Sequence, residues 1–275
     1  MTSTAPAPAQ TPYLRLRQVC LVAPALAPAV ATVQAIFGLP VCYRDPAVAK
    51  FGLENALFAL GSSFLEIVAP TQAGTAAGRF LARSGAPGQE RGGYMLIFDC
   101  DAPEAHRQRA ELMGVRVAFS LDCPDYQGVQ LHPRDCRAAI LEFDHTVGGQ
   151  ALDGPYHPAG ANWQAGRRLD RVSGLALAEV ESPDPAGLAQ HWSALMGWPA
   201  RAGGDGSHRF DFDFGALRIV AAPPGTPERI SALQVAVGDT AAVLAAAALH
   251  GCQRDSADGG RFLLAGVWFE PVAAG

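Results

Sequence analysis

The sequence predicts an α+β fold built from four tandem βαβββ modules, the last one shortened. Their strands are expected to form cup-shaped mixed β-sheets with the helices packed outside. Apolar runs typical of a first strand begin near residues 14, 93, 171 and 230. A helix-patterned segment follows each run, and further strand-like runs follow each helix. Single parallel strands that alternate with helices would give a different order, so a Rossmann fold or a TIM barrel is excluded.

The first two modules show the pattern most fully. Apolar residues at helical spacing end at Gly38, which precedes Leu39 and Pro40 and is a typical stop for a helix. The expected elements of the first module are a strand over 14–23, a helix over 24–38, and strands around 41–44, 56–60 and 64–69. Those of the second are a strand over 93–99, a helix over 103–113, and the strand-like runs VRVAFSL, YQGVQLH and AAILEFD.

The third module ends its helix at Gly197, before Trp198 and Pro199, as the first does at Gly38. Residues 146–168 have neither helical nor strand periodicity and are rich in Gly and Pro, which is typical of a connection. We therefore expect a disordered tail over 1–12, a paired-module domain carrying the site over 13–150, a linker or lid over 151–168, and a degenerate paired-module domain over 169–275.

Composition excludes several classes of function. The chain has 275 residues, of which 49% are hydrophobic and 17% charged, and its net charge is −5. Neither nucleic acid nor a membrane is an expected partner, because both call for clustered basic residues or a long apolar run. No signal peptide is visible, and the six cysteines form no CxxC pair. We expect a cytoplasmic monomer or homodimer that binds a small molecule.

Four modules of this kind resemble the vicinal oxygen chelate superfamily, which includes glyoxalase-like and bleomycin-resistance proteins. The resemblance implies metal ligands on the first and last strands of two paired modules. The matching positions are Gln18, Glu66, Tyr94 and Glu142. It therefore implies a divalent metal ion bound by Gln18, Glu66 and Glu142. Tyr94 stands where the superfamily usually has His, so we assign it to substrate binding; the remaining oxygen donors suit Mg²⁺ or Mn²⁺ better than Zn²⁺.

Strand alternation supports the two carboxylates as site residues. Alternation places Gln18 with Leu16 and Cys20, and Tyr94 with Leu96 and Phe98. Glu66 and Glu142 each lie between apolar residues in a strand. A carboxylate in such a strand must be paired, hydrated or bound to a cation, because a bare buried charge is very unfavourable. The alternative is that the two carboxylates line a polar cavity without any metal.

A second resemblance is local. Residues 129–143, VQLHPRDCRAAILEF, resemble a stretch of the methylmalonyl-CoA epimerase-like members, although the glycine of their turn is absent. His132 is a candidate general base, ligand or anion contact, and otherwise caps the end of a strand. Arg134 is a candidate contact for an anionic substrate group. Tyr156 and Trp163 follow in the linker, where they either close over the cup as a lid or pack between the two halves.

The second pair of modules lacks a comparable set. Arg218 stands at the position of Glu66, Leu175 near that of Gln18, and Ala232 near that of Tyr94. Phe269 or Glu270 falls at the position of Glu142. Extradiol dioxygenases of the superfamily keep iron in their second pair with two His and a Glu, which this chain lacks. The second pair is expected to serve as scaffold.

The sequence predicts a metal-assisted lyase or isomerase that acts on a small substrate with vicinal oxygens. Glu66, Glu142 and His132 are the expected catalytic residues. The alternative is a metal-free protein that binds or sequesters a small molecule, as bleomycin-resistance proteins do.

Overall fold

The computed structural model describes residues 12–83, 92–255 and 259–274, so nearly all of the expected N-terminal tail lies outside the described residues. The first half contains β1 (Leu14–Val22), α1 (Leu26–Phe37), the 3₁₀ helix η1 (Pro46–Phe51), β2 (Leu53–Leu60), β3 (Ser63–Pro70), α2 (Ala76–Ala82), β4 (Gly93–Cys100), α3 (Pro103–Leu112), β5 (Val117–Cys123), β6 (Tyr126–Leu131), α4 (Pro133–Cys136) and β7 (Ile140–Thr146). The connection contains η2 (His157–Ala159) and η3 (Trp163–Gly166). The second half contains β8 (Val172–Ser182), α5 (Pro185–Met196), β9 (Arg201–Ala202), β10 (His208–Asp211), β11 (Ala216–Ala221), β12 (Arg229–Val237), α6 (Thr240–Leu249), β13 (Phe262–Leu264) and β14 (Val267–Ala273).

Each half forms one seven-stranded mixed sheet, ordered β2-β3-β1-β4-β7-β6-β5 and β13-β14-β12-β8-β11-β10-β9. In every module the first strand pairs in parallel with the last, as β1 does with β3 and β8 with β11. The two first strands of each half then pair antiparallel at the centre of the sheet. This repeated topology confirms the predicted α+β fold of tandem modules.

Local sequence signals account for the ends of two helices. Gly38 and Gly197 both follow their helices in the left-handed conformation, at φ 67° and 62°, which glycine adopts without steric cost. The strand expected at 41–44 is reduced to one bridge between Tyr43 and Leu57. The short helix α2 was not predicted; it contacts β3 and packs on the cup-side cluster of the first sheet.

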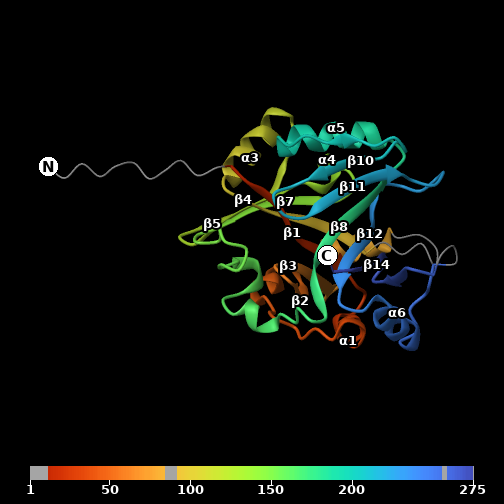
Figure 1. Cartoon of the computed structure of the whole chain (residues 1–275). Coiled ribbons are helices and arrows are strands. Elements are labelled where there is room, and N and C mark those ends of the chain that lie inside the picture. Colours follow the sequence, from red (N-terminus) through yellow and green to blue (C-terminus); the bar gives the residue numbers. More distant parts are fainter. Residues whose placement is uncertain (1–11, 84–91, 256–258, 275) are drawn as a thin grey trace.

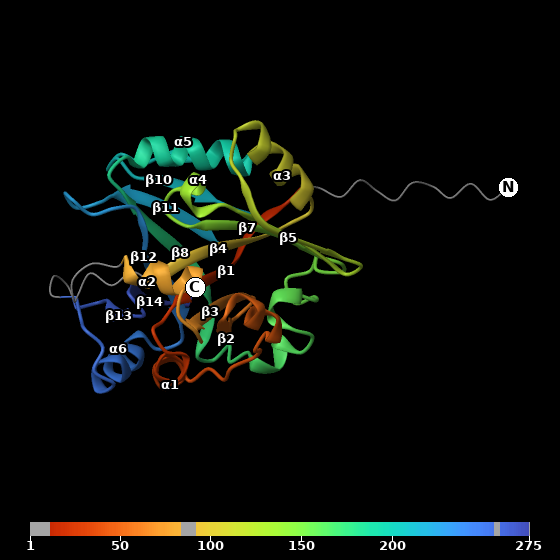
Figure 2. The same cartoon turned by 180° about the vertical axis from the view of Figure 1, so that it is seen from behind.

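The two sheets share one hydrophobic core. It contains residues of both halves from β1 to β14, and Phe37 of α1 packs on Phe262 and Phe269 at 6.0 and 5.9 Å between ring centroids. Helix α1 packs on α6 and α3 on α5, which gives one helix pair on either side of the sheets (Figures 1 and 2). The first sheet lies within residues 13–150 and the second within 169–275, the two ranges expected for paired modules. That each range folds as a separate unit stays a prediction.

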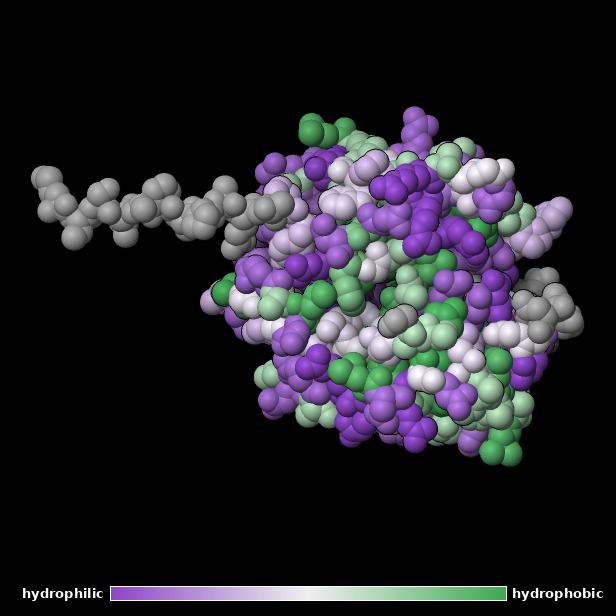
Figure 3. Space-filling model, in the orientation of Figure 1, coloured by the Kyte–Doolittle hydropathy of each residue, from purple (hydrophilic) through white to green (hydrophobic). Residues whose placement is uncertain are grey.

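Polar and apolar residues are intermixed on the face shown in Figure 3. The most exposed large apolar side chains, Leu112 and Leu249, belong to different helices. Within the described residues, no helix is long and apolar enough to cross a membrane.

Candidate active site

The face of the first sheet that points away from the shared core carries several buried carboxylates, among them the two predicted site residues. Glu66 lies on β3 and Glu142 on β7, and their exposed fractions are 7% and 8%. Strands β1 and β4 lie between them in the sheet. Glu66 is close enough to raise the pKa of Glu142, so the structure brings these two predicted residues into one site, which we call the first cup.

Side-chain amides satisfy the carboxylate of Glu66. Gln18 donates its Nε2 to Oε2 at 2.9 Å, and Asn55 of β2 donates its Nδ2 to Oε1 at 2.7 Å. Burial raises the pKa of Glu66, and these hydrogen bonds oppose the rise. The Oε1 of Gln18 is buried and has no hydrogen-bond partner among the described residues.

Glu142 has a similar set of donors. Gln130 of β6 donates to its Oε2 at 2.7 Å, and the hydroxyl of Tyr126 donates to its Oε1 at 3.3 Å. Burial raises its pKa to about 7. Asp144 is two residues further along the same strand and is fully buried, and its pKa is raised by burial and by the charge of Glu142.

The sequence analysis missed the donors Asn55, Tyr126 and Gln130. Gln130 and Tyr126 are four residues apart in a strand, so alternation alone would have placed both on one face. That β6 lies beside Glu142 follows only from the pairing of β6 with β7.

The register of the sheet moves the fourth expected ligand position by one residue. The β1 partner of Glu66 is Cys20, and Gln18 lies two residues before it. The residue with the same relation to Glu142 in the second module is Met95, because the β4 partner of Glu142 lies at position 97. Met95, and not Tyr94, is therefore equivalent to Gln18.

Tyr94 lies at an irregularity in the pairing of β4 with β1. Its ring packs edge-on against Phe80 of α2 at 5.1 Å. Leu96 and Phe98 belong to the shared core, whereas Tyr94 packs against a separate cluster on the cup side. The expected alternation of Tyr94 with these two residues was therefore wrong.

A similar irregularity lies between Leu16 and Gln18 in β1. Leu16 points into the shared core, while Cys20 packs in the cup-side cluster and Gln18 reaches Glu66. The expectation that Leu16, Gln18 and Cys20 share one face was therefore wrong for Leu16. A β-bulge reverses the alternation at one point and leaves no mark in the sequence.

The structure does not bring His132 or Arg134 to the two carboxylates. His132 caps α4, where its Nδ1 accepts from the backbone N–H of Arg134 at 3.3 Å and lies 3.2 Å from a guanidinium nitrogen of Arg116. Arg134 is exposed. These contacts match the strand-end alternative for His132, and its catalytic role remains without a contact to support it.

Tyr156 and Trp163 fold into the first cup and not between the two halves. Both are buried, and both pack on Phe64 of β3, at 4.8 Å in a stacked and 5.0 Å in an edge-on arrangement. The indole Nε1 of Trp163 donates to the carbonyl of Gly154. Residues 147–168, which we call the strap, thus line one end of the cup.

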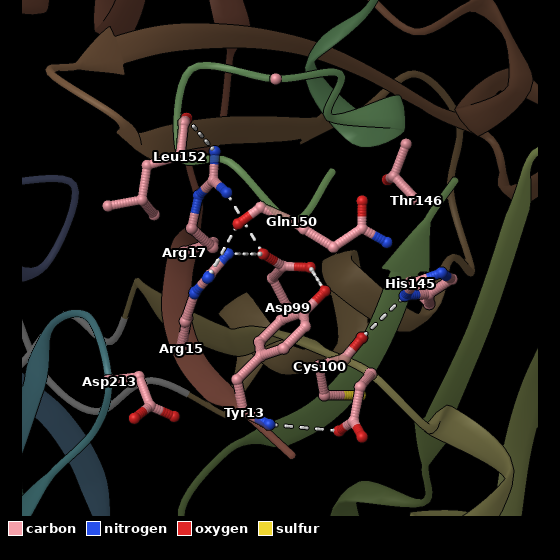
Figure 4. Close-up of polar contacts among 12 residues, drawn as sticks. Tyr13, Arg15, Arg17, Asp99, Cys100, His145, Thr146, Gln150, Leu152 and Asp213 are labelled. Carbon is pink, nitrogen blue, oxygen red and sulfur yellow. Dashed lines mark hydrogen bonds and ion pairs between the residues drawn. The ribbon is translucent and has the colours of Figure 1, made fainter. Parts of the chain in front are cut away.

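Two arginines of β1 hold the strap (Figure 4). Arg17 is fully buried, pairs with Asp99 at 3.2 Å and donates to the carbonyl of Leu152 at 3.1 Å. Arg15 pairs with Asp99 at 3.3 Å and donates to the carbonyl of Gln150 at 2.9 Å. The sequence analysis missed this network, because nothing local shows that β1 and the strap meet.

A cleft of about 570 Å³ lies beside the cup. It is lined by the turn between β5 and β6 and by the end of β7, and it includes Tyr126 and His145. Since the Tyr126 hydroxyl donates to Glu142, one side chain links the cleft with the carboxylate.

The residues present do not fit a resident divalent ion. Both carboxylates already accept hydrogen bonds from side-chain donors, and the amide nitrogen of Gln18 faces Glu66. The fourth position holds the thioether of Met95, a soft and poor ligand for Mn²⁺ or Mg²⁺. In the described part of the chain, no group of three or more His, Cys, Asp or Glu side chains could hold a metal ion.

The equivalent positions of the second sheet carry different chemistry. Arg218 stands at the position of Glu66 and forms an ion pair with Glu179, which lies opposite it on β8. The residue equivalent to Gln18 is Leu177, two residues before Glu179, and not Leu175. Glu270 accepts hydrogen bonds from Gln234 and Arg261. These contacts agree with a scaffold role.

Neither the protein-family models nor the curated proteins include a match to this sequence. Among solved structures, a mutant of 4-hydroxymandelate synthase from Streptomyces coelicolor superposes with a TM-score of 0.64 and 14% identity, covering 96% of this chain and 95% of that one. The Mn(II)-bound glyoxalase from Novosphingobium aromaticivorans gives a TM-score of 0.62 and 14% identity, covering 96% and 83%.

Methylmalonyl-CoA epimerase from Streptomyces coelicolor is 21% identical over 49% of this chain, but its TM-score of 0.42 is too low to establish a shared fold. The 4-hydroxymandelate synthase and the glyoxalase span nearly the whole chain, and at 14% identity they show its fold alone. The chain therefore has the fold of the vicinal oxygen chelate superfamily, with glyoxalase-type modules arranged in two pairs.

Proposed function

We propose that the first cup catalyses proton transfer on a small oxygenated molecule, as a lyase or isomerase that needs no resident metal ion. The observation that carries the proposal is the buried carboxylate of Glu142, held by Tyr126 and Gln130, whose pKa burial raises to about 7. A carboxyl group that titrates near neutral pH exchanges protons most effectively under those conditions.

The reaction would begin at a carbon next to a carbonyl group. Ionised Glu142 takes a proton from that carbon, and the electron pair moves onto the carbonyl oxygen to give an enolate. Tyr126 and Gln130 hold the carboxylate in place through their hydrogen bonds. In an α-hydroxy carbonyl compound, protonated Glu142 then returns the proton to the former carbonyl carbon. The proton of the α-hydroxyl group passes to the enolate oxygen, so that the hydroxyl becomes the new carbonyl and the isomerisation is complete.

The metal-assisted form of this reaction has less support. It would require Glu66 and Glu142 to give up hydrogen bonds that they now accept. The Oε1 of Gln18 has no hydrogen-bond partner among the described residues, but Met95 would supply no oxygen or nitrogen. A lost ligand typically weakens metal binding strongly, so a stoichiometric ion would need another donor.

A second candidate is a metal-free protein that sequesters a small molecule. It is favoured by the complete set of donors on Glu66, which leaves that carboxylate few free positions. It is also favoured by the strap, whose Tyr156 and Trp163 close one end of the cup.

The test is hydrogen exchange into α-hydroxy carbonyl compounds. Protein in D₂O with a chelator is incubated with dihydroxyacetone, glyceraldehyde or 2-hydroxyacetophenone, and loss of the C–H signal is followed by NMR. Exchange by the wild type that Glu142→Gln abolishes supports the proposal. The matched control is Glu179→Gln, which alters a buried carboxylate of the second sheet and should leave exchange unchanged. Binding without exchange of any probe would favour the sequestering protein.

A further inference from the structure

The ring of Tyr156 sits in a seat formed by Phe64 and Arg17. It stacks on Phe64 with 4.8 Å between centroids and 13° between planes. The guanidinium carbon of Arg17 lies 4.7 Å from the centre of the Tyr156 ring and 5.7 Å from that of Phe64. A flat ring that contacts both an aromatic face and a cation fits this seat well.

Two polar atoms at the seat have no hydrogen-bond partner among the described residues, although the terminal nitrogens of Arg17 are paired. The hydroxyl of Tyr156 and the Nε of Arg17 are both buried, and neither has a hydrogen-bond partner among the described residues. Buried polar atoms of a permanent core normally have partners, and each exception is unfavourable. Tyr156 therefore fills the shape of the seat but leaves its hydrogen bonds unused.

The strap is attached by side-chain contacts and single hydrogen bonds, without sheet pairing. His157 stacks on Tyr126, and its backbone N–H donates to the hydroxyl of Thr146. Arg15 and Arg17 hold two of its carbonyls, and Tyr156 and Trp163 supply its buried aromatic contacts. Between β7 and β8 it contains only short 3₁₀ helices and no strand, and many of its residues are exposed. A segment without sheet pairing can leave its seat without disturbing the sheet.

From these contacts we propose that the strap is displaceable, and that Tyr156 occupies the seat of a planar aromatic ligand with a carboxylate or hydroxyl group. The ligand ring takes the place of the Tyr156 ring on Phe64, and its oxygen accepts from the Nε of Arg17. This proposal names a class of ligand for the proposed site. It depends on the proposed function only because it places the ligand in the first cup.

The experiment follows backbone hydrogen–deuterium exchange in wild-type protein by mass spectrometry, with 4-hydroxybenzoate as probe. Saturating probe should raise exchange in peptides covering residues 147–168 and leave β8 to β14 unchanged. The matched probe is 4-hydroxycyclohexanecarboxylate, which has the same groups on a ring that is not planar and should have no effect. Probe that binds without raising exchange in the strap would overturn the proposal.

Two variants test the seat itself. Phe64→Leu should weaken the probe about tenfold, since it removes the stacked ring. Tyr156→Leu should tighten it about tenfold, because it removes the competing ring. If the probe binds Tyr156→Leu but not the wild type at millimolar concentration, it only fills an engineered cavity and the proposal fails. These measurements need no catalytic turnover. If the probe opens the strap but the protein catalyses no Glu142-dependent proton exchange, the proposed reaction fails and the displaceable strap stands.

Discussion

Arg17 and Asp99 form an ion pair of 3.2 Å on the cup side of the first sheet, and Arg17 is fully buried. Asp99 also pairs with Arg15, and the hydroxyl of Tyr13 lies 3.3 Å from its Oδ1. Burial raises the pKa of Asp99 while the two arginines lower it. The carboxylate of Asp99 on β4 thus contacts Tyr13, just before β1, and both arginines of β1 that hold the strap.

Asp99→Asn is expected to destabilise the protein by about 3–5 kcal/mol, because it leaves the buried guanidinium of Arg17 without its counter-charge. The change should lower the urea midpoint and raise exchange in residues 147–168. Arg107→Gln is the control, since Arg107 pairs with Glu104 on the surface of α3. It should leave the midpoint nearly unchanged. Equal effects of the two substitutions would mean that the Asp99 network is not energetically special.

The contribution of Glu142 to stability is expected to fall as the pH rises from about 4.5 to about 7. Burial raises the pKa of Glu142 from 4.5 to about 7 in the folded chain, so between these values the folded state binds more protons than the unfolded state. The free energy of unfolding then decreases with pH and levels off above the folded pKa. The raised pKa values of Glu66 and Asp144 act in the same direction, whereas burial lowers the pKa of His106 from 6.5 to about 4, which acts in the opposite direction. Urea titrations across this range should show a smaller slope in Glu142→Gln, and an unchanged slope would refute the assignment.

The sequence was informative where a signal is local. Gly38 and Gly197 marked two helix ends correctly, and the module order followed from periodicity. Glu66 and Glu142 were found because a carboxylate between apolar strand residues is unusual. The bulge after Leu16 and the irregularity at Tyr94 could not be predicted, because they depend on pairing between β1 and β4.

Contacts between distant segments were also beyond the sequence. Asn55 and Gln130 are ordinary strand residues until β2 and β6 take their places beside the carboxylates. Tyr156 was a candidate lid, but no local pattern could reveal that it stacks on Phe64. Assigning such residues required the tertiary structure.

Met95→His is expected to create a metal site that the wild type lacks. The substitution adds an imidazole at the position equivalent to Gln18, and it should raise the affinity for Zn²⁺, Ni²⁺ and Co²⁺ at least about tenfold. Tyr94→His is the matched control: its side chain would lie beside α2, so it should change little. Calorimetric titration of both variants decides the matter. A stronger effect of Tyr94→His would mean that Tyr94, and not Met95, holds the position equivalent to Gln18. A stoichiometric transition metal in wild-type protein would contradict the metal-free reaction.

The shared core should make the two halves of the chain unfold together. Phe37 belongs to the first half, and its ring contacts Phe262 and Phe269 of the second. Phe37→Ala should therefore destabilise both sheets together, by about 3–5 kcal/mol, as one cooperative transition. Phe51→Ala is the control, because Phe51 is 44% exposed and should matter much less. Denaturation followed by tryptophan fluorescence and by circular dichroism should give coincident curves for the wild type. Two separate transitions, of which Phe37→Ala moves only the first, would instead support independent domains over 13–150 and 169–275.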